Sequence, residues 1–258
     1  MQPDGSKLAT LYIAKALFSK AFTGQCRSLS ESCMVKIYLD SARVDSWSLP
    51  SGCPPVRGVT TNPTLVFQAG LPVNLSTYLG LISAAADHGM AELMLQLPQS
   101  NPAQAREWLK TLQPAAHARN VGLTIKLPCA PDWEACIDAV RAEQQGILLT
   151  GLSNAVQLLW AQSKGVQYVA PYVGRLANDG RNVWALMEAC VRVQAHGPAL
   201  LAASIKTPEV LAQLVAVGAA AVTLPPASLA AWCTDALTQT AVQQFDHDIQ
   251  ASLKIPQR

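Results

Sequence analysis

From Val35 onward, short apolar stretches alternate with helical segments along almost the whole chain. No linker and no low-complexity segment interrupts the series. Eight strands that are nearly all followed by a helix are typical of a (β/α)8 barrel rather than of an open sheet, so we predict an α/β protein with a TIM-barrel fold. The predicted strands are 35–40, 56–62, 93–98, 122–128, 146–151, 168–173, 199–204 and 220–225.

Helix signals separate these strands. Gly89 is suited to end the first long helix, and Asn101 followed by Pro102 is a favourable cap and first-turn pair for the next. The predicted helices are 75–88, 101–120, 132–144, 154–163, 182–195, 208–217 and a segment from about 228.

The length of 258 residues suits one large domain, and half of the residues are hydrophobic. We place the barrel domain at residues 34–237 and a C-terminal helix and tail at 238–258. The apolar residues Val242, Phe245 and Ile249 recur every three to four positions, so this helix has one face to bury. The face could close the bottom of its own barrel or dock on a neighbouring subunit.

The first 33 residues have a different composition. No acidic residue occurs between Asp4 and Glu31, and basic residues are spaced among apolar ones, as in an amphipathic or transit-like segment. Lys15 interrupts the apolar run, which argues against a secretory signal, and the run is too short for a membrane span. We expect residues 1–33 to be an N-terminal extension outside the fold.

The net charge and the cysteine content argue against several classes of protein. The net charge is +2 without any basic run, which argues against a nucleic-acid partner. The seven cysteines are scattered and form no CxxC pair, which is typical of reduced thiols in a cytoplasmic protein rather than of a disulfide framework or a zinc site.

One ammonium group stands inside a predicted strand. In 122–128, Leu123, Ile125 and Leu127 alternate with Thr124 and Lys126, so the lysine lies on the face opposite the three apolar residues. If both faces of the strand are covered, Lys126 can reach water only through a cavity. Its pKa would then be lowered, and the neutral amine could form an imine with a carbonyl substrate. The alternative is a strand-end lysine that extends to solvent.

Polar residues also mark the carboxyl ends of the other strands, where barrel enzymes place their chemistry. One such residue alone would fit a solvated rim or a helix cap, but the whole set indicates one pocket. The set consists of Asp40, Asn62, Gln96, Lys126, Thr150, Tyr172, Arg175, Ser204 and Lys206.

Five separated segments carry a family resemblance: 39–41, 58–64, 125–128, 168–175 and 203–208. They resemble the signature segments of the transaldolase family, and most closely its small-chain branch, which contains fructose-6-phosphate aldolase and the short transaldolases. The resemblance covers roughly residues 34–253. It implies a ring-shaped homo-oligomer, such as a pentamer or decamer, in the cytoplasm.

The resemblance also implies roles for the polar residues. Lys126 would be the Schiff-base lysine, Asp40 would handle protons at the substrate hydroxyls, and Asn62 with Thr61 would bind the ketose. A second group would hold the water that relays protons, and a third would bind the sugar phosphate. The water group is Thr150, Gln96 and Tyr172, and the phosphate group is Arg175, Ser204 and Lys206.

Two residues bear on the type of activity. Transaldolases of this family tend to carry Glu and Phe where this chain has Gln96 and Tyr172, whereas the aldolases carry Gln and Tyr. We therefore favour an aldolase that cleaves the C3–C4 bond of a ketose phosphate such as fructose 6-phosphate, with a transaldolase as the alternative. The residues after Thr150 and the loop from Asp40 to Gly58 depart from the family, which leaves the aldehyde substrate open.

Two other functional classes fit the sequence less well. A barrel that binds sugar phosphate without turnover would require a broken catalytic set, and this set is complete. A metal-dependent aldolase would require histidine and carboxylate ligands that converge on one site. No metal is expected, because the histidines all fall in or at the ends of helical segments: His88, His117, His196 and His247. No cofactor is expected either, because a protonated imine on the lysine is itself the electron sink.

Overall fold

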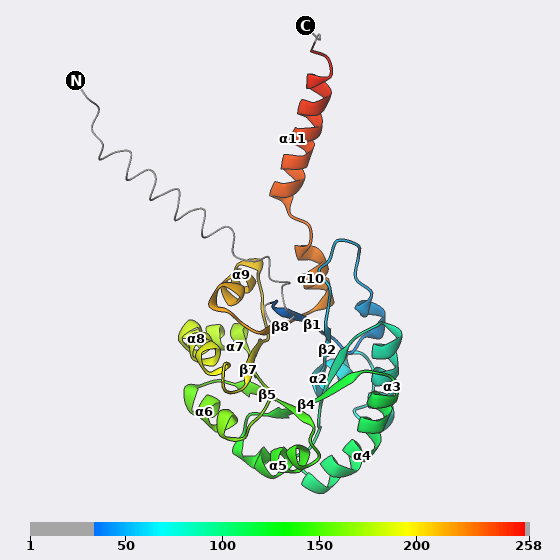
Figure 1. Ribbon diagram of the computed structural model, residues 1–258, viewed down its shortest axis with the longest axis vertical. Helices are drawn as coiled ribbons and strands as arrows, with labels where there is room; N and C mark the ends of the chain where they lie inside the picture. The colour runs from blue at the N-terminus through cyan, green and yellow to red at the C-terminus, as the bar shows by residue number, and fades with distance from the viewer. Residues whose placement is uncertain (1–33, 256–258) are drawn as a thin grey trace, which may run out of the picture. The chain divides into compact units, whose positions relative to one another are not determined.

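The computed structural model describes residues 34–255, so the predicted extension at 1–33 lies outside the described residues. Eight parallel strands close into a barrel in sequence order, with the last strand paired to the first (Figure 1). The predicted TIM-barrel fold is confirmed. The strands are β1 (Lys36–Asp40), β2 (Gly58–Thr60), β3 (Glu92–Gln96), β4 (Gly122–Pro128), β5 (Gly146–Leu152), β6 (Tyr168–Pro171), β7 (Ala199–Ala202) and β8 (Ala221–Leu224).

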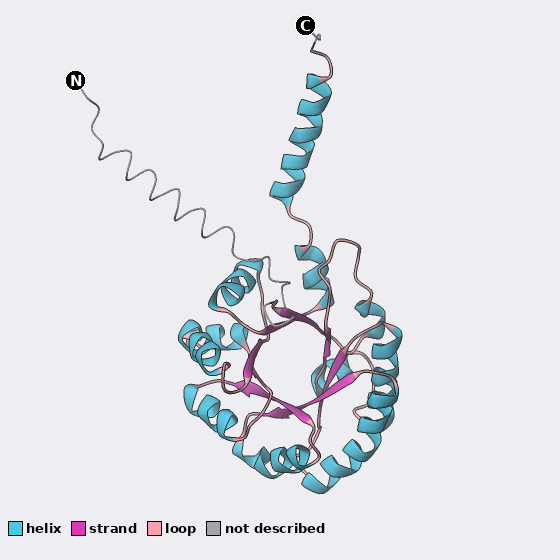
Figure 2. Cartoon of the chain, viewed as in Figure 1, coloured by secondary structure: helices cyan, strands magenta, loops and turns pink. Residues whose placement is uncertain are grey.

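Helices surround the strands on the outside (Figure 2). All the helices predicted from the sequence are present within a few residues, and the short helices α2 and α7 are additional. The helices are α2 (Pro63–Gln68), α3 (Leu75–Asp87), α4 (Pro102–Ala118), α5 (Glu134–Ala142), α6 (Ala155–Ser163), α7 (Val173–Asn178), α8 (Val183–Val193), α9 (Pro208–Val217), α10 (Pro226–Trp232) and α11 (Ala236–Ser252), with 3₁₀ turns η2 (Val44–Trp47) and η3 (Pro131–Trp133).

Asparagine caps start several of these helices. The Asn101 side chain accepts a hydrogen bond from the Gln104 amide at 3.0 Å, as the sequence predicts. Asn154 accepts from the Gln157 amide at 2.9 Å in the same way. Each cap satisfies an amide that has no partner within its helix, so the sequence determines where the chain turns from strand or loop into helix.

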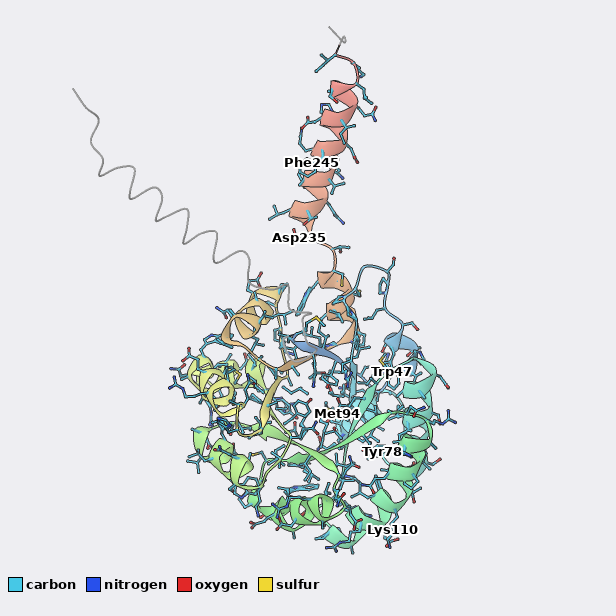
Figure 3. All side chains as sticks on the ribbon, viewed as in Figure 1. Trp47, Tyr78, Met94, Lys110, Asp235 and Phe245 are labelled. Atoms are coloured by element: carbon cyan, nitrogen blue, oxygen red, sulfur yellow. The ribbon has the colours of Figure 1, made fainter. Side chains whose placement is uncertain are left out.

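Alternation along the strands separates two cores. One lies between strands and helices and includes Ile125 and Leu127 of β4, both fully buried. The other lies inside the barrel and includes Met94 and Leu148, and Figure 3 shows Met94 within the ring of strands. Lys126 is in register with Leu148 and belongs to the inward face of β4.

Polar contacts fill the amino-terminal end of the barrel. The Glu92 carboxylate accepts hydrogen bonds of 2.7 Å from the Tyr38 hydroxyl and of 2.7 Å from the Thr124 hydroxyl. Burial, followed by the Glu92 charge, raises the pKa of Tyr38. A Cβ on Gly58 would lie 1.9 Å from the Glu92 carbonyl oxygen, so only glycine permits β2 to approach β3 this closely.

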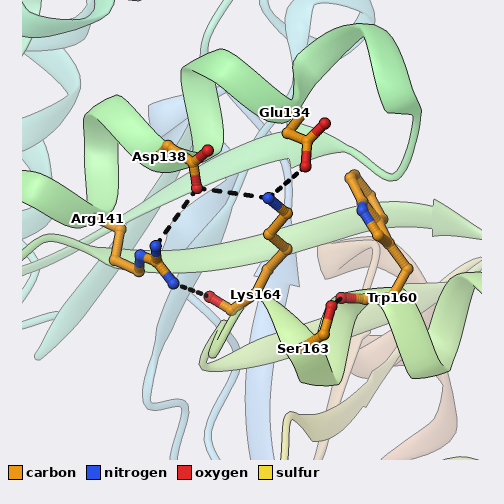
Figure 4. Close-up of polar contacts among 6 residues, drawn as sticks. All are labelled: Glu134, Asp138, Arg141, Trp160, Ser163 and Lys164. Carbon is orange, nitrogen blue, oxygen red and sulfur yellow. Dashed lines mark hydrogen bonds and ion pairs between the residues drawn. The ribbon is translucent and has the colours of Figure 1, made fainter.

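Ion pairs join α5 and α6 on the outside of the barrel. The Lys164 ammonium, at the end of α6, lies 2.5 Å from a Glu134 carboxylate oxygen and 3.6 Å from one of Asp138 (Figure 4). Arg141 contacts Asp138 at 3.5 Å and donates to the Lys164 carbonyl at 3.2 Å. The contacts hold two neighbouring helices together away from the strand ends.

The helix α11 has no buried residue. Asp235 caps it by accepting from the Leu237 amide at 2.8 Å. The predicted apolar face is present but exposed: Val242 is 50%, Phe245 62% and Ile249 54% accessible, and Figure 3 labels Phe245 on this helix. The helix therefore does not bury this face against its own barrel. None of the helices within residues 34–255 combines the length and the apolar character that a bilayer crossing requires.

Candidate active site

A cavity of about 590 Å³ opens at the carboxyl ends of the strands. Its walls come from the segments that follow six strands, which is where a TIM barrel carries its chemistry. The structure brings seven of the predicted site residues to this cavity and leaves Thr61, Lys126 and Thr150 out of its lining. The seven are Asp40, Asn62, Gln96, Tyr172, Arg175, Ser204 and Lys206.

Lys126 points into the barrel directly beside the cavity residue Gln96, its register partner on β3. Its exposed fraction is 5%, so the alternative of a solvent-reaching lysine is wrong. No carboxylate within residues 34–255 forms an ion pair with it. Burial lowers the pKa of Lys126, and the charge of Asp40 opposes this shift more weakly. The amine therefore loses its proton more readily than an ordinary lysine.

Asp40 ends β1 at the wall of the cavity. The Thr60 hydroxyl donates to its carboxylate at 3.0 Å, and Thr60 and Thr223 exchange a hydrogen bond of 2.7 Å inside the barrel. Thr60 thus contacts the carboxylate directly and Thr223 supports Thr60, and neither threonine was predicted as a site residue. Both stand in predicted strands, 56–62 and 220–225, but no local pattern connects them to Asp40.

The hydroxyls of Thr150 and Tyr172 lie 2.7 Å apart, which joins the end of β5 to the end of β6. The predicted strand 168–173 is too long, because β6 ends at Pro171 and Tyr172 caps α7. Beyond Pro171, an isolated bridge pairs Tyr172 with Ala203, and the backbone amide of Val173 donates to the Ala203 carbonyl at 2.9 Å. This early turn directs the Tyr172 side chain to the cavity.

Gln96 is the β3 residue that reaches the cavity. The nearest carboxylate on the same strand, Glu92, lies four residues earlier and is bonded to Tyr38 and Thr124 at the opposite end of the barrel. On β3, the cavity therefore presents an amide, not an acid, beside Lys126.

Asn62 and Thr61 differ in their surroundings. The predicted strand 56–62 is shortened to Gly58–Thr60, and Asn62 caps α2 by accepting from the Leu65 amide at 3.0 Å. Its side-chain NH₂ remains for a ligand hydroxyl. Thr61 is fully buried, and its hydroxyl contacts only the Asn62 carbonyl, at 3.5 Å. The structure thus does not bring Thr61 to the cavity.

Cationic and hydroxyl groups gather on the β6–β7 side of the cavity. The Arg175 guanidinium stacks 4.6 Å above the Tyr172 ring, and Ser204 and Lys206 line the same cavity. Ser204 has a φ of +60°, so the predicted strand 199–204 ends earlier, at Ala202. A Cβ on Gly174 would lie 2.7 Å from the Ser204 carbonyl oxygen, so glycine permits α7 to pack against this turn. Such a group of donors suits a phosphate.

Part of the cavity wall was missed by the sequence analysis, because α2 and α7 were not predicted. The start of α2 carries the same Asn-Pro signal as Asn101-Pro102, which was read correctly. Besides Arg175, which was predicted, the lining residues from these two helices are Pro63, Thr64, Leu65, Gln68, Gly174 and Asn178.

The site combines a shielded amine, a carboxylate and a pair of hydroxyls with a cationic pocket. This combination suits an enzyme that forms imines with phosphorylated carbonyl compounds. The model of the transaldolase/fructose-6-phosphate aldolase family matches residues 37–256. The chain belongs to this family, and it is an enzyme of the aldolase or transaldolase type.

Known relatives agree with this assignment. A probable transaldolase of Clostridium kluyveri is 26% identical over 219 residues, which cover 83% of this chain and 97% of the relative. A probable transaldolase of Bartonella henselae is 29% identical over 83% of this chain and 96% of its own length. A solved structure of flavocytochrome b2 with sulfite bound shares the fold alone, with 13% identity and a TM-score of 0.50 over 78% of this chain and 59% of its own.

Proposed function

We propose that this chain is a class I aldolase that cleaves or forms the C3–C4 bond of a ketose phosphate such as fructose 6-phosphate. The products of cleavage are dihydroxyacetone and an aldose phosphate. One observation carries the proposal: Lys126 lies shielded inside the barrel, with a lowered pKa, next to a cavity that has Asp40 on one side and Arg175 on the other.

Imine formation is the first step. The neutral amine of Lys126 attacks the C2 ketone of the bound sugar, and loss of water from the carbinolamine gives an iminium ion. The Thr150–Tyr172 hydroxyl pair, with Gln96 nearby, is suited to hold the water that carries protons in this step. The phosphate of the sugar binds Arg175, Ser204 and Lys206.

Bond cleavage follows. The iminium withdraws electrons from C3, so the C3–C4 bond breaks when a base takes the proton of the C4 hydroxyl. Asp40 is the carboxylate of the cavity, and its hydrogen bond from Thr60 fixes its direction. The aldose phosphate leaves, and the remaining enamine is protonated and hydrolysed to free dihydroxyacetone and Lys126.

Transaldolase activity is the second candidate. Both relatives described above are probable transaldolases, and in that reaction the enamine attacks a second aldehyde instead of being hydrolysed. Against it stand Gln96 and Tyr172, which support a water network that would release the ketone.

One assay separates the two activities. The enzyme is given fructose 6-phosphate alone and then together with erythrose 4-phosphate, and dihydroxyacetone and sedoheptulose 7-phosphate are measured. An aldolase releases dihydroxyacetone in both mixtures. Formation of sedoheptulose 7-phosphate without release of dihydroxyacetone would refute the aldolase proposal in favour of the transaldolase.

We also propose that the chain acts in the cytoplasm as a homo-oligomer, assembled as a ring in keeping with its family. The exposed apolar face of α11 supports this, because Val242, Phe245 and Ile249 have no partner on their own barrel. Light scattering on the full chain tests the assembly. A monomer at micromolar concentration would contradict it, and Phe245→Ser should weaken the oligomer while Gln244→Ser should not.

A further inference from the structure

Two cysteines from distant parts of the chain meet in this fold. Cys53 lies in the segment between η2 and β2, and Cys233 lies directly after α10. Their sulfur atoms are 2.9 Å apart although the residues are 180 positions apart in the sequence. Both are half-buried, whereas the other cysteines of the described part of the chain, Cys129, Cys136 and Cys190, are buried.

The contact is suited to bond formation. The Cys233 thiol can donate its proton to the Cys53 sulfur or to the Leu229 carbonyl at 3.1 Å. A disulfide has a sulfur–sulfur distance of about 2.05 Å, so the two sulfurs need to approach by less than about 1 Å. Ser51 and Gly52 before Cys53 and Thr234 after Cys233 are exposed, and little packing opposes this movement.

We propose that Cys53 and Cys233 form a redox-reactive pair that hydrogen peroxide converts to a reversible disulfide. The Cys53 sulfur, which accepts a hydrogen bond from the Cys233 S–H, attacks one peroxide oxygen as the thiolate. The O–O bond breaks, hydroxide leaves and takes up a proton, and Cys53 becomes a sulfenic acid. The Cys233 sulfur then attacks the Cys53 sulfur, the S–O bond breaks and a second water leaves. The two sulfurs lose two electrons, and the peroxide is reduced to two waters.

The position of the pair determines what the disulfide would change. It would connect the segment before β2 to the end of α10, which follows β8, so strands β2 to β8 would lie inside one covalent loop. The first residues of α10, Pro226 and Ala227, also line a second cavity of about 490 Å³ together with Arg43 and Ser46 of the η2 region. Oxidation would fix these two walls relative to each other. This inference does not depend on the proposed aldolase activity.

The test uses the full chain, reduced and then treated with a small excess of hydrogen peroxide. Mass spectrometry of the unreduced digest should find the peptides of Cys53 and Cys233 joined. The melting temperature should rise on the order of 5–15 °C, because a cross-link that closes so long a loop restricts the unfolded chain. Dithiothreitol should reverse both changes.

Matched variants locate the effect. Cys53→Ser and Cys233→Ser should each abolish the cross-link and the rise in melting temperature, with little change in the melting temperature of the reduced protein. A rise that persists in either variant would overturn the proposal. It would equally be overturned if Cys53 were found joined to another cysteine or to a second chain, or if both thiols stayed reduced while other cysteines were oxidised.

Discussion

A lysine inside this barrel and a lysine on its outside have pKa values that are shifted in opposite directions. Lys126 on β4 is 5% exposed and Lys164 after α6 has a side chain that is 15% exposed, so both are largely covered. Burial lowers the pKa of Lys126, whereas the hydrogen bond that Lys164 donates to the Glu134 carboxylate is the main reason that the pKa of Lys164 is raised. Covering alone therefore does not determine the proton affinity of a lysine. The decisive difference is a carboxylate in direct contact.

The comparison also separates two kinds of polar group. Those on the outer helices pair with one another and connect α5 to α6 (Figure 4). Those at the carboxyl ends of the strands leave the Lys126 amine and the Arg175 guanidinium without carboxylate ion-pair partners in the described part of the chain. The first kind stabilises the fold, and the second is available for a substrate.

Replacement of the two lysines gives the largest contrast. Lys126→Met should reduce cleavage of fructose 6-phosphate by at least about 10⁴-fold, because no amine remains to form the imine. Lys164→Met should leave turnover within about twofold. The measurements are kcat and borohydride trapping with dihydroxyacetone. A covalent adduct on Lys206, or on any lysine of the Lys126→Met variant, would show that the nucleophile is misassigned.

The next contrast is between Arg175 in the cavity and Arg141 on the outside of the barrel. Arg175→Ala should raise KM for fructose 6-phosphate by about 10- to 100-fold, since a charge-assisted contact to the phosphate is lost. KM for unphosphorylated dihydroxyacetone in the synthetic direction should change much less. Arg141→Ala on the outside should alter neither value. Equal effects of Arg175→Ala on both substrates would remove Arg175 from the phosphate site.

Tyr172→Phe tests the role of a single oxygen atom in the cavity. The variant keeps the ring beneath Arg175 but loses the hydroxyl that contacts Thr150 at 2.7 Å. Release of dihydroxyacetone should fall relative to transfer by about 3- to 10-fold, because the water that hydrolyses the enamine is less well held. The product ratio with erythrose 4-phosphate present measures this. KM for the phosphate ester should stay within about twofold, and an unchanged ratio would contradict the assignment.

The smallest effect is on stability, and it should have opposite signs for the two lysines. The folded chain releases the Lys126 proton more easily than the unfolded chain, so wild-type stability gains from Lys126 as pH rises toward its unfolded pKa of about 10.4. Lys126→Met should therefore be more stable than wild type near pH 7, on the order of 1 kcal/mol, with the gain shrinking as pH rises.

Lys164 should behave in the reverse way. Its folded pKa is raised, so its stabilising contribution is complete below the unfolded pKa and is lost as pH rises through the folded pKa. Lys164→Met should melt slightly below wild type at pH 7, and the difference should vanish at high pH. Melting curves of both variants from pH 6 to 11 measure these trends. The same sign for both variants would contradict the comparison.

Much of this architecture could be predicted because alternation along a strand is local information. Leu123, Ile125 and Leu127 mark the outer face of β4 and put Lys126 on the opposite face. The pattern left open whether the lysine extends to solvent, and its exposed fraction of 5% in the structure excludes this. The helices α2 and α7 escaped prediction because six residues are too few to reveal a helical period. Because these helices were not predicted, the predicted strands before them are too long, and part of the cavity wall was not identified.

Contacts between segments that are distant in the sequence could not be predicted from the alternation of residues along a strand. Nothing near Asp40 indicates that Thr60 and Thr223 hold its carboxylate, and nothing near Cys53 indicates Cys233. Thr61 was included because it stands beside Asn62 in a signature segment, yet neighbours in an extended chain point in opposite directions. The structure accordingly buries Thr61 while Asn62 lines the cavity.

The short helix α7 has a mechanical consequence. Tyr172 stands at its start and Arg175 lies within its first turn, with the guanidinium resting on the phenol ring. We therefore expect an anion bound by the guanidinium to influence the position of the ring, and with it the phenol oxygen that contacts Thr150. A ligand without an anionic group would not bind the guanidinium and would therefore not have this influence on the ring.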